Sequence, residues 1–174
     1  MKVPYNDLSR IHEPLRTAFH ESLDIALNTS GFVGDTTFAD AFKKYTNSQH
    51  CVTCNSGTDA LYIAIKALEL KPGSRIAVPA ISYAATAMAV VNAGHVPVFI
   101  DVDSDTGLML VDTVKDVDCV IPVHLYGQCV DVHTLLKLGV PVIEDCAQAH
   151  GACIDGKHVG NFGAIGCFSF YPGK

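Results

Sequence analysis

The feature of this sequence that most constrains its fold is a run from Ile76 to Ile100 without a single Asp, Glu, Lys or Arg. An uncharged run of this length is long enough to span a bilayer as one helix. Residues that end helices or are polar interrupt it, namely Pro79, Asn92, Gly94, His95 and Pro97. We therefore interpret the run as a strand, a loop, a helix and a second strand, all buried in an α/β protein.

The segments after residue 48 alternate between strand and helix patterns. Short apolar, β-branched segments predict strands at 50–53, 76–78, 96–102, 118–123, 140–144 and 165–170. Helical periodicity predicts helices at 59–70, 84–92 and 132–138. This alternation predicts an α/β fold with a mostly parallel, doubly wound sheet, in which ligands bind at the carboxyl ends of the strands.

The N-terminal part differs, and composition excludes some partners. Residues 1–30 predict an arm and a helix, with Leu15, Phe19, Leu23 and Leu27 at four-residue intervals. The 174 residues are 49% hydrophobic and 17% charged, which is typical of a globular core. The net charge is −6 and the basic residues are scattered. We therefore expect neither a nucleic acid nor a membrane as a partner.

The seven cysteines are an odd number, and residues 1–10 lack the apolar core of a signal peptide. We therefore expect reduced thiols and a cytoplasmic location. Cys51 and Cys54 form a CxxC motif, which a thiol-redox centre or half a zinc site would also contain. A redox pair requires the second cysteine inside a helix and a zinc site requires a second ligand pair, so structural thiols are the preferred interpretation.

No metal site is expected. Asp101, Asp103 and Asp105 resemble the start of a calcium-binding loop, but Thr106 stands where that loop requires glycine. His124 follows a predicted strand, and we interpret it as a structural histidine with satisfied hydrogen bonds, with a place in the pocket as the alternative.

Several residues directly after strands are candidates for binding or chemistry. Asn55-Ser56-Gly57-Thr58 precedes a predicted helix, where backbone N–H groups and the helix dipole can hold a phosphate; an ordinary helix cap is the alternative. Tyr83 can stack on a flat ring or simply pack. Asp145 ends an apolar strand, where a carboxylate is costly unless it meets a cation or caps a turn.

The remaining candidates lie close to Asp145 or at the end of the sequence. Gln148 and His150 can reach the same pocket or support it from behind. Ser169 lies near the end of the last predicted strand, and Lys174 follows that strand. A lysine after a Pro-Gly turn can enter a pocket with a lowered pKa, although most lysines are simply solvated.

Taken together and in this order, the segments SGTDAL (56–61), VIEDCAQAHGA (142–152) and FSFYPGK (168–174) resemble the DegT/DnrJ/EryC1/StrS aminotransferases. The segments VPVFIDVD (96–103) and IPVHLYGQ (121–128) are similar to the same family. The resemblance implies fold type I, a three-layer sandwich like the large domain of aspartate aminotransferase, and pyridoxal 5'-phosphate as cofactor.

The resemblance also implies roles for individual residues. Gly57, Thr58 and Ser169 would hold the cofactor phosphate, and Tyr83 would stack on the pyridine ring. Asp145 would pair with the ring nitrogen, Gln148 would contact the ring hydroxyl, and Lys174 would bind the cofactor as an aldimine and act as the catalytic acid and base. Gly34 and His150 are expected to contact substrate.

The implied reaction transfers an amino group from L-glutamate to a keto group of a nucleotide-linked sugar, in amino sugar biosynthesis for lipopolysaccharide or polysaccharide. Asp59 and the segment ISYAATA (81–87) favour 3-oxo over 4-oxo sugars by the same resemblance. A nucleotide-sugar dehydratase is an alternative, although such members carry histidine where Lys174 stands. A non-catalytic or split-chain fragment that binds a partner chain or phosphate ligand is another.

The resemblance further implies the domain organisation. Residues 1–30 would form an N-terminal arm and helix, and residues 31–174 the first part of the large, cofactor-binding domain. We expect the rest of that domain and a small C-terminal domain to be absent from this chain. Members of the family are homodimers with shared active sites, and the same is expected here.

Overall fold

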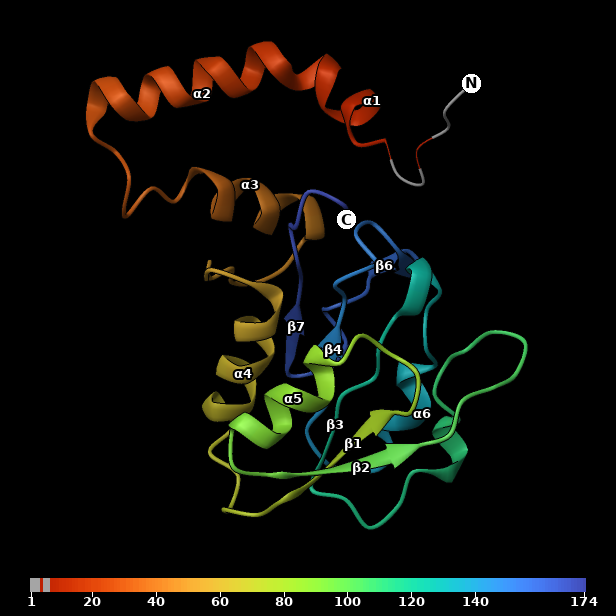
Figure 1. Ribbon diagram of the computed structural model, residues 1–174. Coiled ribbons are helices and arrows are strands. Elements are labelled where there is room, and N and C mark those ends of the chain that lie inside the picture. The colour runs from red at the N-terminus through yellow and green to blue at the C-terminus, as the bar shows by residue number, and fades with distance from the viewer. Residues whose placement is uncertain (1–3, 5–6) are drawn as a thin grey trace.

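A computed structural model describes residue 4 and residues 7–174 of the chain (Figure 1). The helices are α1 (Ser9–His12), α2 (Arg16–Thr29), α3 (Thr37–Thr46), α4 (Gly57–Ala67), α5 (Ala85–Asn92) and α6 (Val132–Leu136), with 3-10 turns at Glu13–Leu15, Val111–Thr113 and Leu125–Gly127. The strands are β1 (Arg75–Pro79), β2 (Val96–Ile100), β3 (Cys119–Val120), β4 (Ile143–Asp145), β5 (Cys153–Ile154), β6 (Lys157–His158) and β7 (Ile165–Cys167).

Three parallel strand pairs and two parallel bridges connect the main strands into one arrangement. β1 lies between β2 and β3, and β4 pairs with β7, all in parallel. Two parallel bridges, Val120 with Val142 and Val123 with Asp145, connect the β3 segment to the β4 segment. The spatial order is therefore β2-β1-β3-β4-β7. Among the described residues, the short β5–β6 hairpin and the isolated bridge of Val102 with Met109 are antiparallel.

Helices cover both faces of this sheet, and alternate residues of each strand face opposite layers. Ile76 and Val78 of β1 pack with α4 and α5, whereas Ala77 packs in the second core with Val132 and Leu135 of α6. Figure 1 shows α4 and α5 on one side of the strands and α6 on the other. The structure therefore confirms the predicted three-layer α/β fold.

The uncharged run from Ile76 to Ile100 forms most of β1, α5 and β2 rather than one long helix. Ile76, Val78 and Val90 are fully buried, which explains the lack of charge. In the part of the chain that the structure describes, every helix is too short or too polar to cross a membrane.

The structure differs from the sequence-based expectations in two places: one predicted strand is absent from the described part of the chain, and one hairpin was not predicted. The strand predicted at 50–53 is wrong: the segment is irregular and Val52 is 89% exposed, since no described strand pairs with it. The β5–β6 hairpin was not predicted, although its turn carries an Asp-Gly signal. Asp155 and Gly156 both have positive φ, as a two-residue hairpin turn requires.

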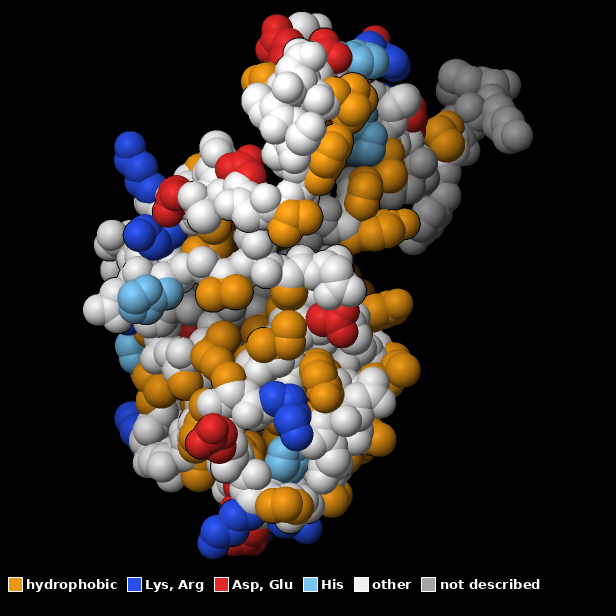
Figure 2. Space-filling view, turned by 90° about the vertical axis from the view of Figure 1, so that its left-hand side faces the viewer, with side chains coloured by type: hydrophobic (Ala, Val, Ile, Leu, Met, Phe, Trp, Pro, Cys, Tyr) orange, Lys and Arg blue, Asp and Glu red, His pale blue; other side chains and the backbone are white. Residues whose placement is uncertain are grey.

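The first helices extend away from the sheet (Figure 1). α2 has no buried residue, and Leu15, Phe19, Leu23 and Leu27 are between 45% and 56% exposed. Figure 2 shows apolar side chains on this arm and over the body below it. Exposed apolar side chains of the body on α4 and α5 are those of Ile63, Met88 and Val91. Such surfaces are typical of sites that another chain or segment covers.

Candidate active site

The N-terminus of α4 packs directly against the segment after β7. Ser56 caps the helix by accepting a hydrogen bond from the backbone N–H of Asp59, and its own hydroxyl donates to Oδ2 of Asp59 over 2.9 Å. A β-carbon built on Gly57 would stand 2.8 Å from Cβ of Ser169. The absence of a side chain at Gly57 therefore lets the helix N-terminus and the hydroxyl of Ser169 meet, and Thr58 is half-buried beside them.

This arrangement suits an anion. α4 is 11 residues long, and its first N–H groups have no partner within the helix. The helix dipole adds a partial positive charge at the same point. The cap, one of the two alternatives from the sequence, is present on Ser56. It leaves the N–H groups of Gly57 and Thr58 without a hydrogen-bond partner among the described residues, so the phosphate cradle stays a prediction.

Asp145 is a buried carboxylate at the carboxyl end of β4. It is 4% exposed; Oδ2 accepts a hydrogen bond from Oγ1 of Thr86 at 2.9 Å, and Oδ1 accepts one from the backbone N–H of Ala147 at 3.1 Å. Burial raises the pKa of Asp145, against the hydrogen bonds from Ala147 and Thr86 and the positive charge of Lys174. A cation at this site would therefore be bound strongly by the carboxylate.

Lys174 follows β7 through a turn, in which its backbone N–H donates to the carbonyl of Tyr171 over 2.8 Å. Its side chain is exposed, and its charge lowers the pKa of Asp145. It acts on His150 as well: burial and the charge of Lys174 lower the pKa of that imidazole, against a hydrogen bond with the backbone of Ser169. The positive charge of Lys174 therefore acts on both Asp145 and His150.

His150 packs beside two aromatic rings, with ring centroids 5.7 Å from Phe168 and 5.1 Å from Phe170. Its Nε2 atom is buried and has no hydrogen-bond partner within the described chain. A buried polar atom of this kind is costly unless a ligand or water satisfies it.

Tyr83 and Gln148 lie on two loops at the carboxyl ends of strands. Tyr83 is 73% exposed and, with Thr86, lines a pocket of about 240 Å³ between β1 and α5. Gln148 is fixed by its Oε1 atom, which accepts a hydrogen bond from the backbone N–H of Tyr126 at 2.9 Å. Tyr126 has a φ of 55°, a strained value that Gln148 helps to maintain.

Gly34 is the candidate that lies apart from the others. It is exposed in the turn between α2 and α3, with a φ of 84°, and a β-carbon built on it would meet nothing within 4 Å. The structure therefore gives Gly34 a turn role in this chain and no contact with the residues around Asp145.

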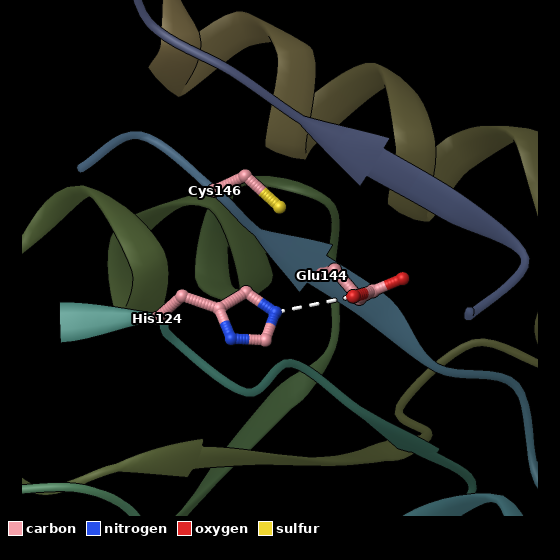
Figure 3. Close-up of side chains that lie close together, drawn as sticks. All are labelled: His124, Glu144 and Cys146. Atoms are coloured by element: carbon pink, nitrogen blue, oxygen red, sulfur yellow. Dashed lines mark hydrogen bonds and ion pairs between the residues drawn. The ribbon is translucent and has the colours of Figure 1, made fainter. Parts of the chain in front are cut away.

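Glu144 of β4 and His124 form a buried network (Figure 3). Both side chains are 0% exposed, and Nε2 of His124 lies 3.1 Å from Oε2 of Glu144. Glu144 also accepts hydrogen bonds of 2.7 to 2.8 Å from the backbone N–H groups of Gly160, Phe162 and Gly163. The carboxylate thereby fastens the 160–163 loop, which leads into β7.

This network explains His124 without a metal. Nδ1 of His124 accepts a hydrogen bond from the backbone N–H of Val130, so the proton lies on Nε2, which donates to Glu144. The thiol of Cys146 lies nearby (Figure 3), and the three ligand atoms are within 4.8 Å of one another. Burial raises the pKa of Cys146 well above 9, so the thiol is neutral in this structure. The structural interpretation of His124 is confirmed.

Sequence reasoning missed Thr86. This residue is 59 positions from Asp145, and a single threonine in an alanine-rich helix carries no signal for a contact over that separation. It also left open what Glu144 does, because its four hydrogen-bond partners come from two distant loops.

Comparisons with known proteins identify the family of this chain. The sequence model of the DegT/DnrJ/EryC1/StrS aminotransferase family matches residues 12–174. A UDP-N-acetyl-3-dehydro-alpha-D-glucosamine 3-aminotransferase of Acidithiobacillus ferrooxidans is 42% identical over 99% of this chain and 50% of its own length. A UDP-2-acetamido-2-deoxy-3-oxo-D-glucuronate aminotransferase of Pseudomonas aeruginosa is 37% identical over 80% of this chain and 41% of its own.

Solved structures agree as well. DesV of S. venezuelae, determined in complex with a ketimine intermediate, has 34% sequence identity and a TM-score of 0.90, over 99% of this chain and 50% of DesV. The chain spans about half the length of the relatives it matches. The family match over most of the chain, together with these relatives, supports one conclusion: this chain belongs to the DegT/DnrJ/EryC1/StrS aminotransferase family.

Proposed function

We propose that this chain serves a pyridoxal-phosphate-dependent aminotransferase that moves an amino group from L-glutamate to a keto group of a nucleotide-linked sugar. The observation that carries the proposal is the grouping of a helix N-terminus, a buried carboxylate and a lysine at the carboxyl ends of neighbouring parallel strands. Gly57 packs on Ser169, while Asp145 lies within the electrostatic reach of Lys174.

The residues present fit pyridoxal phosphate. The N–H groups of Gly57 and Thr58 and the hydroxyl of Ser169 are suited to the phosphate, because Gly57 leaves no β-carbon in that space. Asp145 is suited to a protonated ring nitrogen, since its buried carboxylate gains most from a cation. When bound, the cofactor supplies a protonated pyridine ring that accepts electrons from the substrate carbon.

The chain's own residues then have defined tasks. Tyr83 would cover one face of the ring and exclude water from it, and Gln148 would orient the ring hydroxyl from its fixed position beside Tyr126. Lys174 would hold the cofactor through its Nζ atom, and the same amine would move a proton at the α-carbon of the amino donor. Asp145 would keep the ring nitrogen protonated.

The substrate we propose is a 3-oxo nucleotide sugar. The relatives from A. ferrooxidans and P. aeruginosa are named for 3-dehydro and 3-oxo sugars, and a relative from Streptomyces venezuelae is a dTDP-3-amino-3,4,6-trideoxy-alpha-D-glucose transaminase. His150 is suited to a polar group of substrate, because its buried Nε2 atom lacks a partner in the described chain. Gly34 is proposed to contact the substrate as well, from the exposed turn between α2 and α3.

The assembly we propose is a homodimer with shared active sites, formed in the cytoplasm, for the biosynthesis of amino sugars of lipopolysaccharide or polysaccharide. The exposed apolar side chains of α2 support a protein partner. The domain division into an arm (residues 1–30) and the first part of a cofactor-binding domain (residues 31–174) is part of this proposal.

The test is an assay of the purified protein with pyridoxal phosphate, L-glutamate and UDP-linked 3-oxo or 4-oxo sugars. The expected result is stoichiometric 2-oxoglutarate and amino sugar, with the 3-oxo sugar preferred. A deoxy product without an amine would indicate the dehydratase alternative. Retention of cofactor with no turnover of either sugar would indicate the non-catalytic alternative.

A further inference from the structure

Thr86 contributes a buried hydroxyl to the surroundings of Asp145. It is 2% exposed, and its Oγ1 atom donates to Oδ2 of Asp145 over 2.9 Å. A second hydroxyl, Oγ of Ser82, lies 3.0 Å from Oγ1 of Thr86. An ionised carboxylate can only accept hydrogen bonds, so the single proton of Thr86 goes to Asp145 and the proton of Ser82 goes to Thr86.

The two carboxylate oxygens of Asp145 are therefore held separately. Oδ1 accepts from the backbone N–H of Ala147, which belongs to the loop after β4, and Oδ2 accepts from Thr86 on α5. Donors from two elements prevent the carboxylate from rotating about its own bond. Each oxygen retains a further lone pair for a ligand.

We propose that Thr86 is a positioning residue, which holds the Asp145 carboxylate ionised and in one orientation towards the ring N–H of the cofactor. This inference rests on the proposed function. Burial favours the protonated carboxyl, and a protonated Asp145 could not accept a hydrogen bond from a pyridinium with the same strength. Without the hydroxyl of Thr86, the carboxylate would keep the hydrogen bond from the backbone N–H of Ala147 but no side-chain donor among the described residues.

The inference predicts an effect that depends on the ring nitrogen of the ligand. Dissociation constants would be measured for pyridoxal phosphate and for its 1-deaza analogue, in which C–H replaces the ring nitrogen. Thr86→Val removes the hydroxyl and keeps the shape, whereas Thr86→Ser keeps the hydroxyl. Thr134→Val is the matched control, because Thr134 donates to Asp131 over 2.7 Å at α6, away from this site.

The expected result is that Thr86→Val weakens the binding of pyridoxal phosphate about tenfold, the effect of losing one charge-assisted hydrogen bond, and leaves the binding of the 1-deaza analogue unchanged. Thr86→Ser and Thr134→Val should bind both ligands like the unaltered protein. The same pattern should appear when the visible absorbance of the bound cofactor is titrated with pH: only Thr86→Val should shift the midpoint.

Two results would overturn the inference. Equal weakening of both ligands by Thr86→Val would mean that Thr86 only supports the fold around α5. Failure of Thr86→Ser to restore binding would mean that shape rather than the hydroxyl matters. A failure of the proposed function looks different, because the unaltered protein would then bind neither pyridoxal phosphate nor the analogue, and the role of Thr86 would fall with it.

Discussion

Gly57 and Ser169 lie in such close contact that a β-carbon on Gly57 would stand 2.8 Å from Cβ of Ser169. Contacts this short do not occur between real side chains, so either the α4 N-terminus or the segment after β7 would have to move. This contact joins the helix that is proposed to bind phosphate to the segment that carries Lys174. The position of the α4 N-terminus and the position of the segment that carries Lys174 therefore depend on each other.

Gly57→Ala should separate these two segments. We expect at least tenfold weaker binding of pyridoxal phosphate, because the N–H groups of α4 and the hydroxyl of Ser169 would no longer converge. Pyridoxal, which lacks the phosphate, should be affected much less. Fluorescence or absorbance titration with both ligands measures the difference, and an equal loss for both would contradict the phosphate role of this contact.

Asp145→Asn should separate function from stability. The substitution keeps the shape but removes the charge, so transamination should fall by about 10² or more. The stability of the cofactor-free protein at neutral pH should not decrease, because burial raises the pKa of Asp145 and makes the ionised form costly. Steady-state kinetics and urea denaturation test both parts; retained activity, or a large loss of stability, would contradict this account.

The raised pKa of Asp145 also predicts a pH dependence. A carboxyl whose pKa is higher in the folded than in the unfolded protein reduces stability as the pH rises from its ordinary value of 3.8 through the folded value. Asp145→Asn removes that contribution. Its free energy of unfolding should therefore fall less than that of the unaltered protein over this range, measured by denaturation at successive pH values. A parallel pair of curves would argue against the raised pKa.

The stability contributed by Glu144 should depend on pH in the opposite direction to that of Asp145. Burial raises its pKa, but the hydrogen bonds from His124, Gly160, Gly163 and Phe162 outweigh burial and leave the pKa below 4.5. Its contribution to stability is therefore present above pH 4.5 and is lost as the pH falls through the lower folded value. Glu144→Gln turns an amide N–H₂ towards donors, and we expect a loss of about 3–5 kcal/mol at neutral pH.

A matched control for Glu144→Gln is Glu13→Gln. Glu13 pairs with Arg16 over 2.8 Å on the exposed surface, and its loss should change the free energy of unfolding by about 0.5 kcal/mol or less. Denaturant titration at neutral pH compares the two. Similar small effects would mean that Glu144 does not fasten the 160–163 loop.

The cysteine pair should be dispensable. Cys54 is exposed and its thiol donates to the carbonyl of Ser56 over 3.3 Å, a bond that serine can also make. Cys54→Ser should therefore leave both cofactor binding and amino transfer unchanged, with or without a reducing agent. Loss of activity in this variant, measured against Cys153→Ser at another exposed cysteine, would favour the thiol-redox alternative.

The sequence predicted the layers of the fold because strand and helix periodicities differ and buried strands are continuously apolar. Ile76 to Ile100 is the best example, since Pro79 ends β1, Asn92 ends α5 and His95 directly precedes β2. The prediction of a strand at 50–53 was wrong because a local pattern does not reveal whether a strand has a partner. Val52 is β-branched, but a strand requires a partner that no local pattern can supply.

The candidate site was predicted only in part. Asp145 became a candidate because it follows a predicted strand, where an α/β sheet gathers its functional residues, whereas the role of Ser169 came from the family resemblance. The hydroxyl of Thr86 and the contact between Gly57 and Ser169 depend on tertiary packing, which periodicity does not encode. Gly34 was expected to contact substrate, and the structure leaves it in an exposed turn.

Lys174 and Asp145 are proposed to hold pyridoxal phosphate for amino transfer. The measurement that tests it most directly is the absorbance spectrum of the purified protein with added pyridoxal phosphate, before and after L-glutamate. We predict a visible band that depends on Lys174 and bleaches when L-glutamate is added. A protein without this band, or a band that Lys174→Ala leaves intact, would contradict the claim.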